Sequence, residues 1–190
     1  SSISLLESRG LTEAILAHPV TAVVVDSRQV VAGSLFVAVP GTQQDGAAYI
    51  ADAVKRGAVA VISESADPVR GVTTIRVPDA RAALAAVAAA FHGDPATRLQ
   101  MIGVTGTNGK TTTTYMVRHI LASTGRAAGL LGTVEYGIGE RTIPASRTTP
   151  EATTLQALLA QMVTAGCQAA VMEVSSHALD QQRISGRDFD

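Results

Sequence analysis

The chain has 190 residues, of which 46% are hydrophobic and 16% are charged, and its formal net charge is −1. A nearly neutral chain without a basic block does not suit nucleic acid or a membrane surface, so we expect neither as a partner. Aromatic residues make up only 3% and tryptophan is absent, which predicts an aliphatic core of the kind that parallel α/β sheets bury on both faces.

The first half of the chain alternates strand-like and helix-like segments. Short β-branched runs predict strands at residues 20–25, 35–39, 58–62 and 73–77. Alanine-rich segments with helical spacing predict helices at residues 47–56 and 79–91. Asp79 follows a proline and is the expected N-cap of the second helix. The alternation predicts an α/β domain.

A turn-rich stretch separates this domain from the next one. Residues 92–97 read His-Gly-Asp-Pro-Ala-Thr, a combination that ends helices and forms turns. We therefore expect two domains, residues 1–97 and residues 98–190.

A second α/β unit begins at Leu99. Its expected strands are residues 99–104, 128–131 and 169–174, and its expected helices are residues 112–123 and 151–164. Pro150 stands in the first turn of the latter helix, a position that proline favours. Since nucleotide-binding sheets normally have about five or more strands, we expect this domain to be incomplete and the chain to be part of a longer protein.

One loop of the second unit indicates a nucleotide site. Residues 103–114 read Gly-Val-Thr-Gly-Thr-Asn-Gly-Lys-Thr-Thr-Thr-Thr, between the expected strand and helix. Backbone N–H groups of such a loop and the helix N-terminus face a phosphate, the lysine reaches the β/γ-phosphates, and the threonine hydroxyl can bind Mg²⁺. We expect ATP to be bound by Gly106, Thr107, Asn108, Gly109, Lys110, Thr111 and Thr112.

A carboxylate ends the last expected strand. Glu173 follows the apolar run 169–172, where it is costly to bury unless it meets a cation. Because Mg²⁺ prefers hard oxygen ligands, Glu173 is the candidate second metal ligand beside Thr111, and Lys110 and Glu173 are the candidate catalytic residues. A glutamate that merely faces solvent is the alternative, and the sequence leaves the choice open.

Cysteine usage and the apolar segments predict a cytoplasmic protein. Cys167 has no second cysteine to pair with, which is typical of reducing compartments, and we expect it to pack as a small apolar residue. The longest apolar stretch, residues 82–91, is too short to cross a membrane, and residues 1–20 do not read as a signal peptide. We therefore expect no membrane insertion.

The phosphate loop and several shorter motifs together resemble a known family. The loop has Val104 where the strict GxxxxGK[ST] pattern has glycine, a variant seen in the Mur ligases and their folate-ligase relatives. The other motifs are Asp26-Ser27-Arg28, residues 33–38, residues 41–46, Arg147-Thr148-Thr149-Pro150, and residues 172–179 with Gln181 and Arg183. In this order the chain resembles, over essentially its whole length, the Mur ligases that make UDP-N-acetylmuramoyl-tripeptides.

The resemblance implies a fold and an activity. The fold would be a small N-terminal α/β UDP-binding domain followed by an incomplete P-loop-type parallel α/β ATPase domain. The activity would be that of an ATP- and Mg²⁺-dependent ligase of peptidoglycan precursor synthesis. It would join a diamino acid to the D-Glu γ-carboxylate of UDP-N-acetylmuramoyl-L-Ala-D-Glu through an acyl phosphate.

The resemblance also implies roles for single residues. Val25 and Ser27 would contact the uridine end, and the loop of Thr42, Gln43 and Gln44 would meet the UDP group. The expected ligands of the muramoyl peptide are Arg147, Thr148, Thr149, Ser175, Gln181 and Arg183. Thr111 and Glu173 would hold Mg²⁺. Arg147 departs from the family pattern, in which many members have asparagine at that position.

Some parts of the family's site lie outside this chain. They are a further metal-binding histidine, a carbamylated lysine and the domain that selects the amino acid. We therefore expect the isolated chain to bind the UDP substrate without turning it over, and the choice between meso-diaminopimelate and L-lysine stays open.

Three other protein classes are alternatives to this interpretation. The D-Ala-D-Ala-adding Mur ligase shares the Asp-Ser-Arg start but fits residues 147–150 and 175–179 less well. A folylpolyglutamate synthetase lacks this kind of N-terminal domain. A non-catalytic module that binds nucleotides or UDP-sugars is the alternative from another functional class.

Overall fold

The computed structural model describes residues 20–41, 45–65 and 69–180. The chain divides into two compact units between Ala88 and Ala89, a point inside helix α3 (Ala80–Phe91). The expected Thr42–Gln44 loop, Gln181 and Arg183 lie outside the described residues.

The first unit contains a parallel sheet of four strands. They are β1 (Ala22–Val24), β2 (Ser34–Ala38), β3 (Ala58–Ser63) and β4 (Thr73–Arg76), and they lie side by side in that order. All four expected strands are confirmed, with ends that differ by one or two residues.

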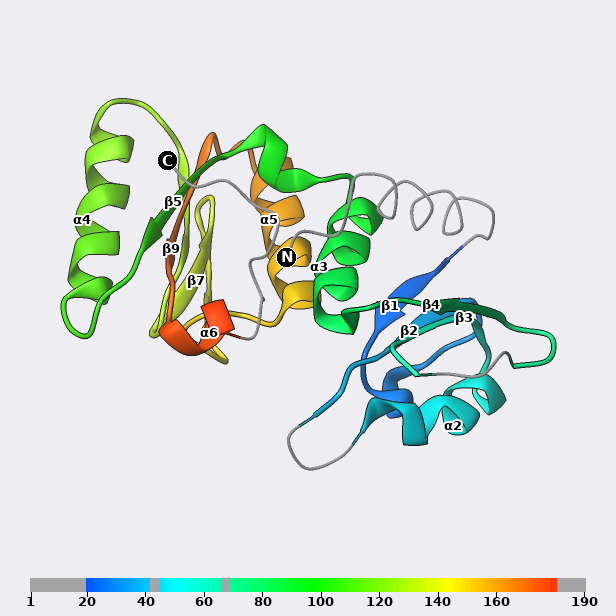
Figure 1. The fold of residues 1–190 in the computed structure, drawn as a ribbon. Coiled ribbons are helices and arrows are strands. Elements are labelled where there is room, and N and C mark those ends of the chain that lie inside the picture. Colours follow the sequence, from blue (N-terminus) through cyan, green and yellow to red (C-terminus); the bar gives the residue numbers. More distant parts are fainter. Residues whose placement is uncertain (1–19, 42–44, 66–68, 181–190) are drawn as a thin grey trace. The chain divides into compact units, whose positions relative to one another are not determined.

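Two helices cover opposite faces of this sheet (Figure 1). Because side chains alternate along a strand, Leu35 of β2 packs with Ala83 of α3, whereas Phe36 packs with Ile50 of α2 (Ile50–Lys55). The N-cap prediction is confirmed, since Asp79 Oδ1 accepts hydrogen bonds of 2.9 Å from two backbone N–H groups of the first turn.

The expected helix at residues 47–56 is corrected at its start. Residues Gly46–Tyr49 form a 3₁₀ turn, η2, and the α-helix begins only at Ile50. Asp45 caps this turn through a 2.9 Å bond from the Ala47 N–H. A Cβ on Gly46 would lie 2.7 Å from the Val39 backbone, so the tight approach of two backbone segments sets the local conformation.

A turn-rich stretch follows α3, as expected, and it lies within the second unit, which begins at Ala89. Asp94 adopts the left-handed conformation with φ 48°, and Pro95 opens the 3₁₀ turn η3 (Pro95–Arg98). Strand β5 (Gln100–Val104) follows directly.

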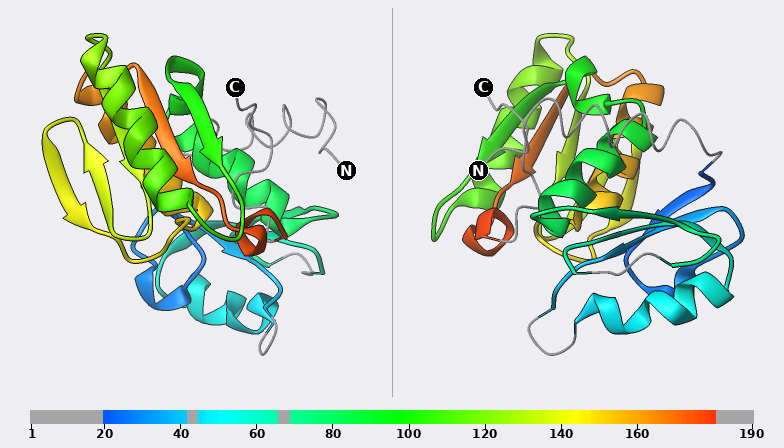
Figure 2. Two further views of the ribbon diagram at one scale, coloured as in Figure 1. Left: turned by 90° about the vertical axis from the view of Figure 1, so that its left-hand side faces the viewer. Right: turned by 45° about the vertical axis from the view of Figure 1, so that its right-hand side comes forward.

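The sheet of the second unit has five strands in the order β5-β9-β6-β7-β8. The first three, β5, β9 (Ala169–Glu173) and β6 (Ala128–Leu131), are parallel and match the expected strands. The other two, β7 (Glu135–Ile138) and β8 (Arg141–Pro144), form an antiparallel hairpin at the edge (Figure 2). The expectation of about three strands is therefore wrong.

The two long helices of this unit lie on opposite faces of its sheet (Figure 1). Helix α4 (Lys110–Ser123) packs against Ala169 and Val171 of β9, whereas helix α5 (Ala152–Thr164) packs against Ala170 and Met172. Buried Cys167 belongs to the α5 side of the core, which confirms its packing role. Helix α4 begins two residues before its expected start, so its first turn contains Lys110.

A side chain at Gly129 of β6 would displace Met162 of α5. A Cβ there would overlap the Met162 side chain, which is fully buried. We expect Gly129→Ala to lower the free energy of unfolding by about 1–3 kcal/mol, measured by urea denaturation, because a well-packed core must shift to accept the methyl group.

Met162→Ala is the second variant of a double-mutant cycle with Gly129→Ala. It opens a cavity at the same contact, so the double variant should lose less stability than the two single losses added together. Simple additivity of the two losses would show that Gly129 and Met162 do not compete for one space.

No helix among the described residues is long and apolar enough to span a bilayer.

Candidate functional site

The phosphate loop joins the end of β5 to the start of α4. Gly109 is the N-cap of α4 with φ 79°, and Gly106 has φ 139°, a backbone conformation that side-chain-bearing residues rarely adopt. Residues 105–109 are exposed, and Lys110 Nζ donates a 2.7 Å hydrogen bond to the Gly106 carbonyl. The exposed loop, the first turn of a long helix and the adjacent ammonium group form a site suited to a polyphosphate.

Glu173 lies beside this loop and is buried. It pairs with Val104 across β5 and β9, which brings it level with the start of the loop, and it is only 1% exposed. Thr111 Oγ1 donates a 3.0 Å hydrogen bond to Glu173 Oε1. The solvent-facing alternative for Glu173 is therefore wrong, and the two expected metal ligands are adjacent.

These two oxygen donors fit a magnesium ion. Among the described residues there is no group of three or more His, Cys, Asp or Glu side chains that could hold a metal alone. Mg²⁺ usually binds through one or two protein oxygens and takes its other ligands from phosphates and water, so a threonine hydroxyl and a carboxylate beside a phosphate loop suffice.

Thr133 is a polar partner of Glu173 that the sequence reasoning missed. Its backbone N–H donates to Glu173 Oε1 at 2.9 Å, and its hydroxyl donates to Oε2 at 3.0 Å. A Cβ on the preceding Gly132 would lie 2.8 Å from Oε1, so glycine leaves room for the carboxylate. The sequence feature that could have indicated Thr133 is its position. Gly132 and Thr133 directly follow β6, and α/β proteins bind ligands at such strand ends.

Three of the residues expected to bind the muramoyl peptide meet at the same edge of the sheet. Thr149 is buried, donates a 2.8 Å hydrogen bond to the Glu173 carbonyl and accepts one of 3.1 Å from the Ser175 N–H. Thr148 Oγ1 lies 3.1 Å from Thr133 Oγ1. Ser175 Oγ in turn accepts from Ala178 N–H in the short helix α6 (Ser176–Asp180).

Arg147 is held by its backbone and has an exposed side chain. Tyr136 Oη donates a 2.7 Å bond to its carbonyl, and its guanidinium lies 3.2 Å from Glu151 Oε1. The charge of Arg147 is therefore already partly compensated within the chain.

In the first unit, Val25 and Ser27 line one surface pocket. This pocket has a volume of about 380 Å³, and its other lining residues are Asp26, Arg28 and Tyr49. Ser27 is buried and its side chain bonds the Asp52 carboxylate, which helps to lower the pKa of Asp52. The two residues expected at the uridine end thus share one pocket.

The Asp26–Arg28 pair sets the charge of this pocket. Arg28 donates side-chain and backbone hydrogen bonds to Asp26 and lowers its pKa from 3.8 to about 2. Because the pKa of Asp26 is lower in the folded chain than in the unfolded chain, ionised Asp26 stabilises the fold at pH values above about 3.8. This stabilisation is lost as the pH falls from about 3.8 to about 2. We expect Arg28→Gln to raise the titration midpoint of the Asp26 carboxyl, observed by ¹³C NMR, toward 3.8.

Arg70→Gln, which removes an exposed arginine elsewhere in the same unit, is the control and should leave the midpoint unchanged. An unchanged midpoint in Arg28→Gln would show that another group holds Asp26 ionised.

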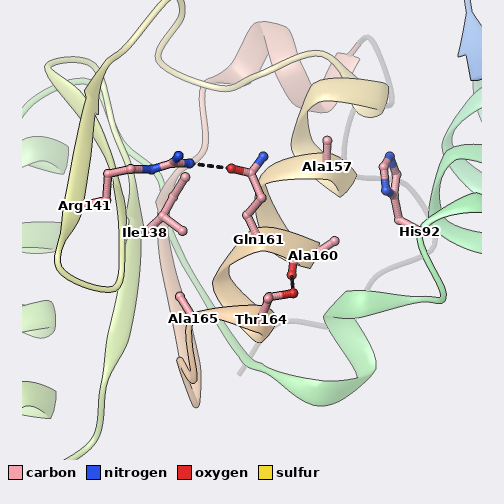
Figure 3. Close-up of a pocket in the computed structure, with 8 residues that line it drawn as sticks. All are labelled: His92, Ile138, Arg141, Ala157, Ala160, Gln161, Thr164 and Ala165. Carbon is pink, nitrogen blue, oxygen red and sulfur yellow. Dashed lines mark hydrogen bonds between the residues drawn. The ribbon is translucent and has the colours of Figure 1, made fainter.

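A second pocket, of about 530 Å³, lies in the second unit away from the phosphate loop. Figure 3 shows it between helix α5, the β7–β8 hairpin and His92, with Arg141 pointing toward Gln161. Burial lowers the pKa of His92. None of the residues expected in the site lines this pocket, and three of its eight lining residues are alanines.

Two family models match the chain. The model "Mur ligase family, catalytic domain" matches residues 19–92, and "Mur ligase middle domain" matches residues 104–190.

Curated relatives have similar sequences. A protein of Geobacter metallireducens named UDP-N-acetylmuramoyl-L-alanyl-D-glutamate–2,6-diaminopimelate ligase is 48% identical over 178 residues, which are 92% of this chain and 34% of that protein. A UDP-N-acetylmuramyl-tripeptide synthetase of Roseiflexus is 49% identical over 179 residues, covering 90% of this chain and 35% of that protein. The chain thus spans about a third of the length of these relatives.

Solved structures agree with these matches. A structure of a UDP-N-acetylmuramoyl-L-alanyl-D-glutamate–2,6-diaminopimelate ligase superposes with a TM-score of 0.77 at 31% identity, covering 90% of this chain and 35% of the other. The MurF ligase of Thermotoga maritima in complex with ADP superposes with a TM-score of 0.56 at 27% identity, covering 82% and 32%.

Proposed function

The chain belongs to the Mur ligase family, and from this premise we propose that it carries the UDP-substrate and ATP sites of a tripeptide-forming ligase. The reaction would join a diamino acid to the D-Glu γ-carboxylate of UDP-N-acetylmuramoyl-L-Ala-D-Glu at the expense of ATP. The observation that carries this proposal is the 3.0 Å hydrogen bond between Thr111 of the phosphate loop and buried Glu173. It joins a phosphate site to a carboxylate in the arrangement that P-loop enzymes use.

The proposed chemistry relies on positioning and charge. A carboxylate is a poor electrophile, so ATP would first phosphorylate it, and the amine would then displace phosphate from the acyl phosphate. The loop N–H groups and Lys110 would hold the ATP phosphates and offset their negative charge. Thr111 and Glu173 would hold Mg²⁺, which supplies further positive charge at the phosphates when bound.

The substrate would be bound by the residues expected from the sequence. Thr148, Thr149 and Ser175 lie at the edge of the sheet that carries Glu173, which supports their role toward the muramoyl peptide. Val25 and Ser27 share a pocket suited to the uridine end. For Arg147 we propose a contact with substrate phosphate or carboxylate in exchange for its pair with Glu151.

The relatives' names favour 2,6-diaminopimelate as the incoming amine. The D-Ala-D-Ala-adding ligases are a less similar class, because their structures superpose with TM-scores of 0.55 to 0.57 against 0.77 for the diaminopimelate ligase. A cytoplasmic location stays a prediction.

Calorimetric titration of the chain with UDP-N-acetylmuramoyl-L-Ala-D-Glu tests the proposal, with ADP and Mg²⁺ in a parallel titration. Saturable binding of both ligands is expected. If only ADP binds, the chain is better described as a generic phosphate-loop module. Binding of UDP-N-acetylglucosamine as tightly as the dipeptide substrate would instead favour a UDP-sugar module.

A further inference from the structure

Two of the hydrogen bonds that fix the Glu173 carboxylate come from one residue. Among the described residues, the side chain of Glu173 has three donors: the Thr111 hydroxyl, the Thr133 N–H and the Thr133 hydroxyl. Thr133 donates to both carboxylate oxygens, so it determines the orientation of the carboxylate plane.

The position of Thr133 is itself held by backbone hydrogen bonds on both sides. The Gly132 N–H donates to the Glu135 carbonyl at 3.2 Å, and the Ala145 N–H donates to the Val134 carbonyl at 3.2 Å. The turn between β6 and β7 is therefore a fixed support. Thr133 as a residue is nevertheless exposed, so its hydroxyl contributes little to the core.

The same hydroxyl contacts the loop before α5. Thr133 Oγ1 lies 3.1 Å from Thr148 Oγ1 and 3.0 Å from Glu173 Oε2. A hydroxyl has one proton, and an ionised carboxylate can only accept. The Thr133 hydroxyl is the donor in both contacts, and its single proton can serve only one of them at a time, so Thr148 competes with Glu173 for that proton.

We propose that Thr133 is a positioning residue that orients the Glu173 carboxylate toward the nucleotide-bound cation and links this carboxylate to Thr148. The inference rests on the function proposed above for Thr111 and Glu173. It adds that the loop expected to meet the muramoyl peptide influences, through the Thr148 hydroxyl, the affinity of the metal site.

The test compares ADP affinity with and without Mg²⁺ by calorimetry. Thr133→Val keeps the shape and the N–H but removes the hydroxyl, and it should reduce the gain in affinity from Mg²⁺ by about tenfold, as is usual for a residue that orients a metal ligand. Binding of ADP in EDTA should not change, which distinguishes positioning from general damage. Thr133→Ser should restore the gain, and Thr142→Val, on exposed β8, is the matched control.

A double-variant cycle tests the link to Thr148. Thr148→Val should raise the Mg²⁺ gain by up to about threefold, because it removes the competing acceptor and leaves the Thr133 proton to Glu173 alone. In the Thr133→Val background it should have no further effect, since the connecting hydroxyl is already absent.

The outcomes separate this inference from the proposed function. If the unsubstituted chain gains ADP affinity from Mg²⁺ and Thr133→Val keeps that gain, the positioning role is wrong while the metal site stands. If the unsubstituted chain gains nothing from Mg²⁺, both the proposed metal site and this inference fail. Should Thr133→Val not fold by circular dichroism, Thr133→Ala carries the same comparison.

Discussion

Replacing Lys110 with methionine is expected to weaken ADP binding on the order of 100-fold, because it removes the charge that faces the phosphates and leaves the chain length similar. Lys110 is the first residue of α4, and its ammonium group already lies across the loop on the Gly106 carbonyl. Calorimetric titration with ADP and Mg²⁺ measures this loss.

The same substitution should act in the opposite direction on stability. A cation at a helix N-terminus opposes the helix dipole, so Lys110→Met should raise the free energy of unfolding by about 0.3–1 kcal/mol. Lys55→Met, in the last turn of α2, is the matched control and should leave ADP affinity unchanged. ADP binding by Lys110→Met within about threefold of the unsubstituted chain would contradict a phosphate role for the lysine.

Glu173→Gln is expected to remove most of the affinity that Mg²⁺ adds to ADP binding, on the order of 100-fold, since a carboxylate that binds the cation becomes a neutral amide. In EDTA the effect of Glu173→Gln on ADP affinity should have the opposite sign. Without a cation the buried carboxylate repels the phosphates, so the neutral variant should bind ADP a few-fold more tightly. Titrations in Mg²⁺ and in EDTA give both values.

Glu140→Gln makes the same chemical change in the exposed turn between β7 and β8 and serves as the control. A uniform loss in Glu173→Gln, with and without Mg²⁺, would indicate a collapsed site and argue against a metal ligand.

Much of the fold was predictable because its strands are uninterrupted aliphatic runs. The strands β2, β3 and β9 are buried along their whole length or nearly so, and such segments are recognised from composition alone. The phosphate loop was predictable for a different reason. Glycine, lysine and threonine at those offsets together bind phosphates and Mg²⁺.

The β7–β8 hairpin was missed because its residues carry conflicting signals. Gly137 interrupts one strand, and the other contains Arg141 and ends in Pro144, residues that disfavour a strand assignment. The informative signal was the two-residue turn, which has Gly139 at φ 59° in its first position, as type II′ hairpin turns require.

Residues of the site were predictable to different degrees. Glu173 stood out because a carboxylate after an apolar run is unusual, whereas Thr133 is a lone threonine after a strand and has no distinctive pattern. Only the pairing of β6 with β9 brings Thr133 to the carboxylate. Such a contact depends on the order of strands in space, which local sequence does not encode.

The strand order also determines when the site can form during synthesis. Strand β9 lies between β5 and β6 and pairs with both, although it follows both in the chain. On the ribosome, β5 therefore emerges without any strand partner, and β6 has only β7 beside it until β9 is made. A parallel strand that waits for a distant partner folds slowly and is prone to aggregate. The phosphate loop is therefore synthesised well before Glu173, the carboxylate that completes the site.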